Sequence, residues 1–286
     1  MDYVYESPCW DLRRNCFWYV SIYAGELWSV NLNSHEKLLV KTFDDIVTSV
    51  NICESGNLLI TTRSEIISYC PGSGSSKLLF TFHFPSINYR INDCKVGPSG
   101  ELFFSSFEDV RPRAKHGSMG FFSIENGASF LLKSFFMTPN GIAISEKDSI
   151  LWVADTGLSL IYQFDYLKLL LNLEDEINPI RVIAVPKHLG RPDGANLDIN
   201  HHYWSANLGF GKISCWGLNG DLLASIKVEG DNPTMIAFAG PSEGILGITY
   251  KMDRSHQNTM GFSLDKTSIR GLATYLFKDQ QHGRRS

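Results

Sequence analysis

The chain has 286 residues, of which 43% are hydrophobic and 20% are charged, and it carries a formal net charge of −4. This composition is that of a globular protein with a sizeable core. The acidic balance argues against a nucleic-acid partner or an anionic membrane surface. No run approaches the roughly 18 uncharged apolar residues that a membrane-spanning helix needs.

The six cysteines are scattered along the chain, mostly inside apolar runs, and no Cys-x-x-Cys pair occurs. That spacing argues against a zinc cluster and favours buried, reduced thiols. The first residues, Met1 to Glu6, lack the basic and apolar regions of a signal peptide. Because disulfides are rare in the cytosol, reduced thiols suit a cytoplasmic protein, and we expect one.

Short runs rich in aromatic and β-branched residues follow one another along the chain, separated by turn residues at intervals of roughly 8 to 12 positions. This pattern is typical of an all-β protein. Examples are residues 16–22, 58–62, 101–106, 150–154 and 245–250. One helix-like stretch, residues 166–176, interrupts the pattern as an insertion that Pro179 ends. We expect a disordered polar tail at residues 279–286.

Polar positions recur along the chain, and most are followed by an apolar strand, a turn and a stronger aromatic strand. The separations between successive positions are 42, 44, 48, 53 and 41 residues. A period of about 40 to 50 residues with several strands per unit predicts a β-propeller. Six units therefore predict one six-bladed β-propeller domain over residues 1–286. The positions are Glu6, Thr48, Asn92, Asn140, Asp193 and Thr234.

The repeat also predicts where these side chains lie. In a propeller the first strand of each blade lines the central channel, so Glu6, Asn92, Asn140 and Asp193 should converge at one mouth. Binding and catalytic residues are commonly found on loops held by a rigid scaffold, so we expect function at this mouth.

Neighbouring features should complete the mouth. Asp155 and Asn207, at the ends of second strands, are expected to join it. The loop at residues 108–117 is the longest between second and third strands and is a lid candidate.

Each polar position also has a simpler interpretation as a turn. Pro192-Asp193-Gly194 is typical of a type I turn, and Asn140-Gly141 of a hairpin turn. Asn92 can bond to its own backbone. However, a turn requires only a residue that suits its backbone, and not a side chain that can bind a ligand. Four such side chains at the same position of four repeats therefore favour a binding site.

Two carboxylates and two amides at one mouth form an oxygen-rich donor set without sulfur or imidazole. Hard cations take such ligands, whereas zinc and copper prefer His and Cys. The set therefore favours Ca²⁺, then Mn²⁺ or Mg²⁺, and leaves Zn²⁺ open.

Four segments carry a resemblance to one family in their order and spacing: residues 6–11 (ESPCWD), 90–100 (RINDCKVGPSG), 139–143 (PNGIA) and 191–194 (RPDG). From Glu6 to about Phe277 the chain resembles the family of regucalcin (senescence marker protein 30), gluconolactonase and luciferin-regenerating enzyme. The fold of that family is a six-bladed propeller, in agreement with the repeat count.

The resemblance implies hydrolysis of sugar lactones with one divalent cation held by Glu6, Asn140 and Asp193. It also implies that Arg90 and Asn92 contact the substrate. In such a site the cation polarises the lactone carbonyl, and Asp193 is the general base that deprotonates the attacking water.

The chain departs from the family at Cys94, where glycine is usual, and we expect a packed thiol there. Only five residues precede Glu6, so we expect residues 272–277 to supply the strand that closes the ring. Two other functions stay open. One is a non-catalytic calcium-binding or scaffold propeller, and the other is a hydrolase of non-sugar lactones or esters.

Overall fold

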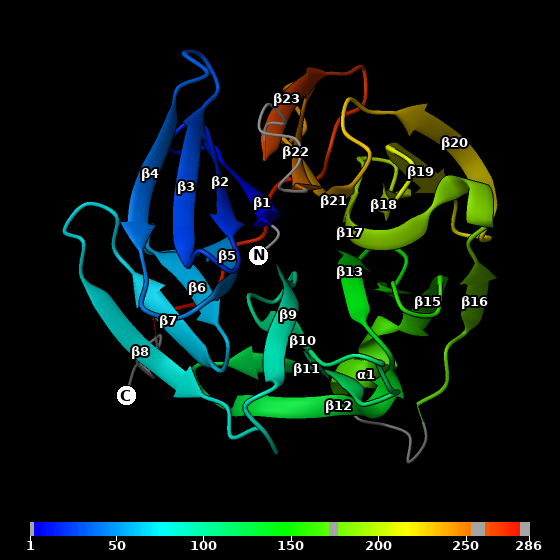
Figure 1. Cartoon of the computed structure of the whole chain (residues 1–286), viewed down its shortest axis with the longest axis horizontal. Helices are drawn as coiled ribbons and strands as arrows, with labels where there is room; N and C mark the ends of the chain where they lie inside the picture. The colour runs from blue at the N-terminus through cyan, green and yellow to red at the C-terminus, as the bar shows by residue number, and fades with distance from the viewer. Residues whose placement is uncertain (1–2, 172–176, 253–260, 281–286) are drawn as a thin grey trace.

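The computed structural model describes residues 3–171, 177–252 and 261–280, and most of these residues lie in β-strands. The strands form antiparallel sheets that stand around a common centre (Figure 1). This arrangement is that of a β-propeller, and the predicted all-β class is confirmed.

Four of the sheets have four strands each, in chain order. The first comprises β5 (Val47–Ile52), β6 (Leu58–Thr62), β7 (Glu65–Tyr69) and β8 (Ser76–Thr81). The second comprises β9 (Tyr89–Val96), β10 (Leu102–Glu108), β11 (Gly117–Ser123) and β12 (Gly127–Phe136). The third comprises β13 (Pro139–Ser145), β14 (Ile150–Asp155), β15 (Leu160–Asp165) and β16 (Arg181–Ala184). The fourth comprises β17 (Arg191–Leu197), β18 (Tyr203–Leu208), β19 (Lys212–Trp216) and β20 (Leu222–Lys227).

The fifth sheet joins the two ends of the chain. Its N-terminal strands are β1 (Tyr3–Asp11), β2 (Cys16–Ser21), β3 (Glu26–Asn31) and β4 (Lys37–Thr42). Its C-terminal strands are β21 (Pro233–Phe238), β22 (Ile245–Met252) and β23 (Phe262–Lys266). The two groups meet where Tyr3 and Val4 of β1 pair with Met252 and Lys251 of β22.

The strands β1, β5, β9, β13, β17 and β21 are the inner strands. Each contacts the next in this order, and β21 contacts β1. In Figure 1 they surround the centre, whereas β4, β8 and β20 lie at the outside. The first residue of each predicted repeat lies on one of these inner strands.

Burial explains why the second strands are such strong apolar runs. Every residue of β2 and of β6 is buried, because these strands pack against neighbouring sheets on both faces. Trp152 of β14, for example, stacks on Tyr203 of β18 with 4.8 Å between ring centroids. The outer strands face solvent on one side, and Leu39 and Leu222 are exposed there.

Every inner strand departs from regular pairing near its polar position. The register of β1 against β2 shifts between Glu6 and Cys9, and that of β13 against β14 shifts between Asn140 and Ala143. β17 has the same irregularity around Asp193. The pairings of β5, β9 and β21 also shift. A β-bulge re-aims the side chains beside it, so each polar position of the repeat lies at or next to a bulge.

The predicted turns at Asp193 and at Asn140-Gly141 are wrong. Both segments are strands with a bulge, within β17 and β13. Proline and glycine inside a strand commonly mark a bulge. These residues, which also favour turns, therefore form bulges here.

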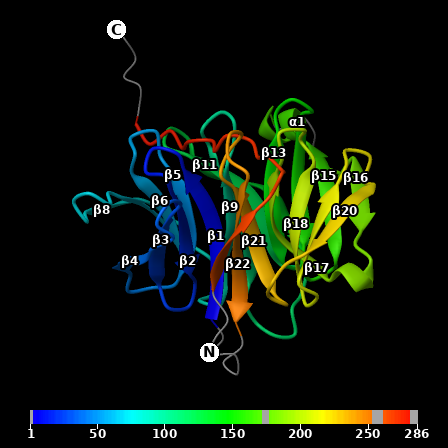
Figure 2. The same cartoon turned by 90° about the horizontal axis from the view of Figure 1, so that it is seen from above.

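The C-terminal segment does not supply a strand, and that prediction is also wrong. Residues 272–276 form no strand and cross the face of the ring opposite the start of β1 (Figure 2). Backbone hydrogen bonds tie this segment to two inner strands: Leu272 donates to the carbonyl of Leu197 and Phe277 to that of Ile52. The apolar run therefore closes one end of the channel.

The predicted helical insertion is α1 (Tyr166–Leu171). The remainder of that stretch, residues 172–176, and the end of the predicted tail, residues 281–286, lie outside the described residues. A short 3-10 helix, η1 (Lys187–Leu189), precedes β17. Within the described part of the chain, no helix is long and apolar enough to cross a membrane.

The bulge in β13 makes a specific demand on Gly141. Its φ is 57°, and an added Cβ would meet the Tyr203 hydroxyl and lie 2.6 Å from the carbonyl oxygen of Asp193. We expect Gly141→Ala to lower the free energy of unfolding by about 3 kcal/mol or more, because backbone strain and overlap add. Urea denaturation measures the loss.

Gly74 provides the matched control, since its φ is 72° and nothing lies within 4 Å of an added Cβ. Gly74→Ala should cost only the strain of a positive φ, about 1 kcal/mol. Equal losses in the two variants would contradict the role assigned to the close approach.

Candidate active site

A cavity of about 590 Å³ opens where the inner strands begin. All five side chains that the sequence singled out line it: Glu6, Arg90, Asn92, Asn140 and Asp193. They come from β1, β9, β13 and β17, which are far apart in the sequence. A cavity of this size suits a small-molecule ligand.

A one-way chain of hydrogen bonds joins four of these side chains. Arg90 Nη1 donates to Asn92 Oδ1 at 2.7 Å. Asn92 Nδ2 donates to Asn140 Oδ1 at 2.5 Å, and Asn140 Nδ2 donates to Asp193 Oδ1 at 2.5 Å. Thr156 Oγ1 also donates to that carboxylate oxygen, at 3.3 Å. The chain runs from a cation to a carboxylate, so each bond polarises the next and fixes the amide orientations.

Glu6 faces the same cavity but lies outside this chain. Among the described residues its carboxylate accepts only the backbone N–H of Ser7, at 3.3 Å. Burial, together with the negative charges of Asp193 and Asp93, raises the pKa of Glu6 well above its usual range. Burial and Asp93 likewise raise the pKa of Asp193 to about 8. Like charges are therefore crowded in a poorly solvated place.

Asp93 is a third buried acid that the sequence analysis did not single out. It follows Asn92 on β9, yet it does not line the cavity. Its Oδ2 accepts the backbone N–H of Ile142 at 2.9 Å, and burial raises its pKa to about 6. The one signal in the sequence is an acid directly beside a predicted site residue.

The loop between β10 and β11 forms one wall of the cavity, as expected of residues 108–117. Its Asp109 accepts Arg90 Nε at 2.9 Å and Arg113 Nη2 at 3.0 Å. Tyr23 donates to the same carboxylate at 3.1 Å. Both guanidinium groups also lie over the Phe107 ring, within 4.6 Å of its centroid. The loop thereby fixes Arg90, which begins the hydrogen-bond chain.

Asp155 and Asn207 do not line the cavity, so the expectation that they join the mouth is wrong. Asp155 is fully buried and accepts the backbone N–H groups of Met137 and Thr138, at 2.8 and 3.0 Å. Asn207 donates to Ser214 inside its own sheet. Asp155 therefore holds the backbone just before Asn140 in place, whereas Asn207 binds a serine hydroxyl of the neighbouring strand.

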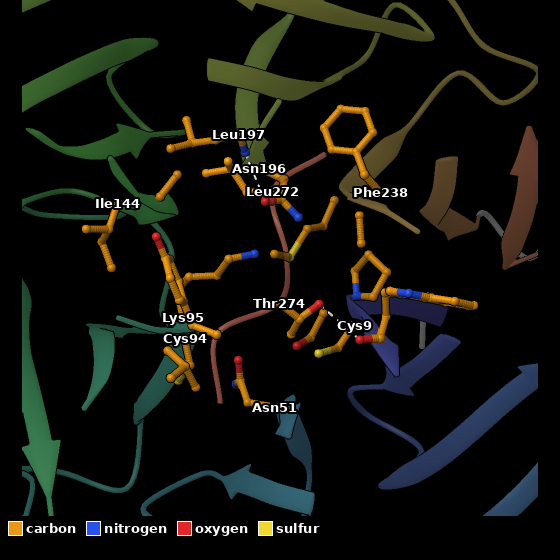
Figure 3. Close-up of a pocket in the computed structure, with 18 of the residues that line it drawn as sticks. Cys9, Asn51, Cys94, Lys95, Ile144, Asn196, Leu197, Phe238, Leu272 and Thr274 are labelled. Carbon is orange, nitrogen blue, oxygen red and sulfur yellow. Dashed lines mark hydrogen bonds between the residues drawn. The ribbon is translucent and has the colours of Figure 1, made fainter. Parts of the chain in front are cut away.

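A second compartment lies in the opposite half of the channel (Figure 3). The C-terminal residues Leu272 and Thr274 line it, and Lys95 and Asn51 reach into it. Its volume of about 40 Å³ holds a few water molecules but not an organic substrate. Cys94 lines this compartment and not the mouth, so its thiol is packed, as expected.

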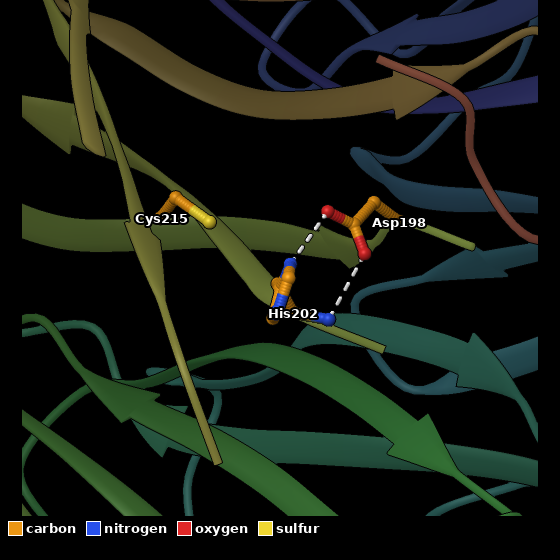
Figure 4. A group of neighbouring side chains, drawn as sticks. All are labelled: Asp198, His202 and Cys215. Carbon is orange, nitrogen blue, oxygen red and sulfur yellow. Dashed lines mark hydrogen bonds and ion pairs between the residues drawn. The ribbon is translucent and has the colours of Figure 1, made fainter. Parts of the chain in front are cut away.

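A third cluster comprises Asp198, His202 and Cys215, whose potential ligand atoms lie within 4.8 Å of one another (Figure 4). Both oxygens of Asp198 already accept hydrogen bonds. Oδ1 accepts the N–H groups of Asn200 and His202, and Oδ2 accepts Trp204 Nε1 and His202 Nδ1. Burial raises the pKa of the Cys215 thiol to about 12, which keeps it protonated. The Asp198 carboxylate therefore stabilises the turn after β17 and binds the Trp204 indole.

The donor set at the mouth fits a hard divalent cation. Glu6 and Asp193 offer carboxylate oxygens and Asn140 an amide oxygen, and neither His nor Cys lines this cavity. A cation between the two acids would supply the positive charge that their raised pKa values indicate is lacking.

These pKa values make stability depend on pH. Folded, Asp193 keeps its proton to about pH 8, whereas an ordinary Asp loses it near 3.8. Between pH 3.8 and about pH 8 the folded state therefore binds more protons than the unfolded state. The contribution of Asp193 to the free energy of unfolding then falls as pH rises. We expect the melting temperature in EDTA to fall by several degrees between pH 5 and pH 8, as measured by scanning calorimetry.

Asp193→Asn is the matched variant, because it keeps the shape and removes the titration. Its melting temperature should fall less over the same range than that of the unsubstituted protein. Parallel pH curves for the two proteins would show that Asp193 is not the group responsible.

The chain is similar to proteins of one family. Residues 4–251 match a family model described as the SMP-30/Gluconolactonase/LRE-like region. The chain is 24% identical to a 6-deoxy-6-sulfogluconolactonase of Pseudomonas putida, with 95% of this chain and 94% of that protein aligned. It is also 24% identical to human regucalcin, with the same coverage of 95% and 94%.

A solved structure of regucalcin from Agrobacterium tumefaciens, named as a calcium-binding protein, has the same fold. The TM-score is 0.84 at 20% identity, and the match covers 96% of this chain and 94% of that one. At this identity the likeness concerns the fold alone.

Proposed function

The chain belongs to the SMP-30/Gluconolactonase/LRE-like family, and we propose that it is a metal-dependent hydrolase of sugar lactones. Relatives at low identity are named as a 6-deoxy-6-sulfogluconolactonase and a pentonolactonase. One observation carries the proposal: two carboxylates that form no ion pair among the described residues and a polarised amide chain meet in one open cavity. That combination suits a reaction in which water adds to a carbonyl.

The architecture that supports this site is, we propose, a single domain of six blades over residues 1–286. Six repeat positions and the successive contacts of the inner strands support that count. The ring would close through the pairing of Tyr3 and Val4 with the end of β22.

Glu6, Asn140 and Asp193 are the proposed ligands of one divalent cation. Because every donor is oxygen, Ca²⁺ is favoured, then Mn²⁺ or Mg²⁺, with Zn²⁺ also able to bind. When bound, the cation would polarise the lactone carbonyl and stabilise negative charge on its oxygen. In this structure Asn140 Nδ2 faces Asp193, so the Asn140 side chain would have to turn to offer its amide oxygen to the cation.

Asp193 is the proposed general base. The charge of the bound cation would lower the pKa of Asp193 and so ionise it. The carboxylate then accepts a proton from the water that adds to the carbonyl carbon, while Thr156 holds it in place. The bond between that carbon and the ring oxygen then breaks. The ring oxygen leaves as a hydroxyl after taking a proton, so lactone and water become one open hydroxy acid.

Arg90 and Asn92 are the proposed substrate-positioning groups. Arg90 Nε and Nη1 bond to Asp109 and Asn92, and Nη2 is the guanidinium nitrogen left without a partner among the described residues. That nitrogen can donate to a sugar hydroxyl. The polar lining also favours a sugar over an apolar ester, which is the basis for preferring sugar lactones to other esters.

A cytoplasmic location is part of the proposal. All six cysteines are unpaired and five are buried, which supports a reducing compartment.

An assay of several aldonolactones with Ca²⁺, Mn²⁺, Mg²⁺ or Zn²⁺ tests this function. We expect turnover that EDTA abolishes, and we expect Asp193→Asn to lower kcat/KM at least about a hundredfold, since it removes the base and a ligand. pH-stat titration of the acid released measures the rate.

Asp44→Asn is the control, because Asp44 is exposed and does not line the cavity. It should behave like the unsubstituted protein. Equal, metal-independent rates in all three proteins would refute the proposal. Cation binding that Asp193→Asn abolishes, without any turnover, would instead support the non-catalytic calcium-binding propeller.

A further inference from the structure

We infer that the substrate of this site carries an anionic group, such as a phosphate or sulfonate, that Arg111 and Arg191 bind. The inference rests on the proposed lactone hydrolysis and concerns the class of lactone. It comes from the charges around the cavity and from which of them already have partners.

The cavity is basic although the whole chain is acidic. Five cationic side chains line it against three carboxylates, whereas the chain as a whole has 26 Lys and Arg against 30 Asp and Glu. The cationic residues are Arg90, Arg111, Arg113, Arg191 and Lys251. A cleft of one sign attracts ligands of the other.

Two of these arginines are committed to the protein. Arg90 and Arg113 share the carboxylate of Asp109 and lie over Phe107. Arg113 Nη1 also donates to Thr138 at 2.9 Å. These contacts hold the wall of the cavity, and Nη2 is the part of the Arg90 guanidinium that they leave for a ligand.

Arg111 and Arg191 differ in this respect. Neither guanidinium has a hydrogen bond or ion pair with any residue that the structure describes, and both residues are exposed within the cavity lining. Burial is the main cause of a lowered pKa of Arg113, and the like charges of Arg90 and Arg111 add to it. An anion bound there would relieve that repulsion.

Both arginines line the same cavity as Asp193. Arg191 stands two residues before Asp193 on β17, and its charge acts on that carboxylate. Arg111 belongs to the loop between β10 and β11. A guanidinium presents parallel N–H groups that match the oxygens of phosphate, sulfonate or carboxylate. Two such groups on different elements can hold one anionic substituent while the lactone ring lies at Asp193.

The test compares three hexono-1,5-lactones that differ at carbon 6, with a hydroxyl, a phosphate or a sulfonate. We expect kcat/KM to be at least about tenfold higher for a charged lactone than for the neutral one. Arg111→Gln and Arg191→Gln should each reduce that ratio by about tenfold, as expected for the loss of one charge-assisted contact.

Lys115→Gln is the matched control, since Lys115 is an exposed cation of the same loop outside the cavity lining. It should leave the ratio unchanged. Hydrolysis of the neutral lactone at an equal or higher kcat/KM would overturn the inference while leaving the lactonase function intact. A ratio that survives both arginine variants would also overturn it. Hydrolysis of none of the three lactones would overturn both proposals.

Discussion

The site depends on a backbone irregularity that recurs in each inner strand. In a regular strand alternate side chains enter the sheet packing, but a bulge breaks that alternation and turns a polar side chain to the channel. The bulge leaves peptide groups unpaired, and small hydroxyl side chains of neighbouring strands satisfy them. Ser105, opposite the bulge of β9, accepts the N–H of Asp93 and donates to the carbonyl of Pro139. Each repeat unit therefore contains a bulge in its inner strand as well as a set of strands.

That arrangement has an electrostatic consequence. Asp93 satisfies the neighbouring bulge by accepting the N–H of Ile142, so its carboxylate is held close behind the mouth. Burial is the main cause of the raised pKa values of Glu6 and Asp193, and the charge of Asp93 adds to it. A group that stabilises the backbone thus adds to the cost of ionising both acids at the mouth. The same contact that builds the scaffold favours a cation at its centre.

The sequence alone predicts the all-β class, the repeat and the five residues that line the mouth, because spacing and residue type carry that information. It does not distinguish a turn from a bulge at Pro192-Asp193-Gly194, since both use residues that tolerate unusual backbone angles. Residues 272–277 are likewise apolar enough for a strand, yet their partners are the ends of β17 and β5. Those contacts depend on tertiary structure, as does the burial of Asp155, so local pattern could not reveal them.

The C-terminal segment closes one end of the channel, so the proposed reaction would take place at the other end. The compartment behind the C-terminal segment is too small for a sugar, so the mouth is the wider opening among the described parts of the channel. The arginines at the mouth differ in their partners. Asp109 binds Arg90 and Arg113, whereas Arg111 and Arg191 form no ion pair among the described residues. The metal ion proposed at Glu6 and Asp193 and the anionic lactone proposed beyond it would give partners to the two acids and to the two arginines.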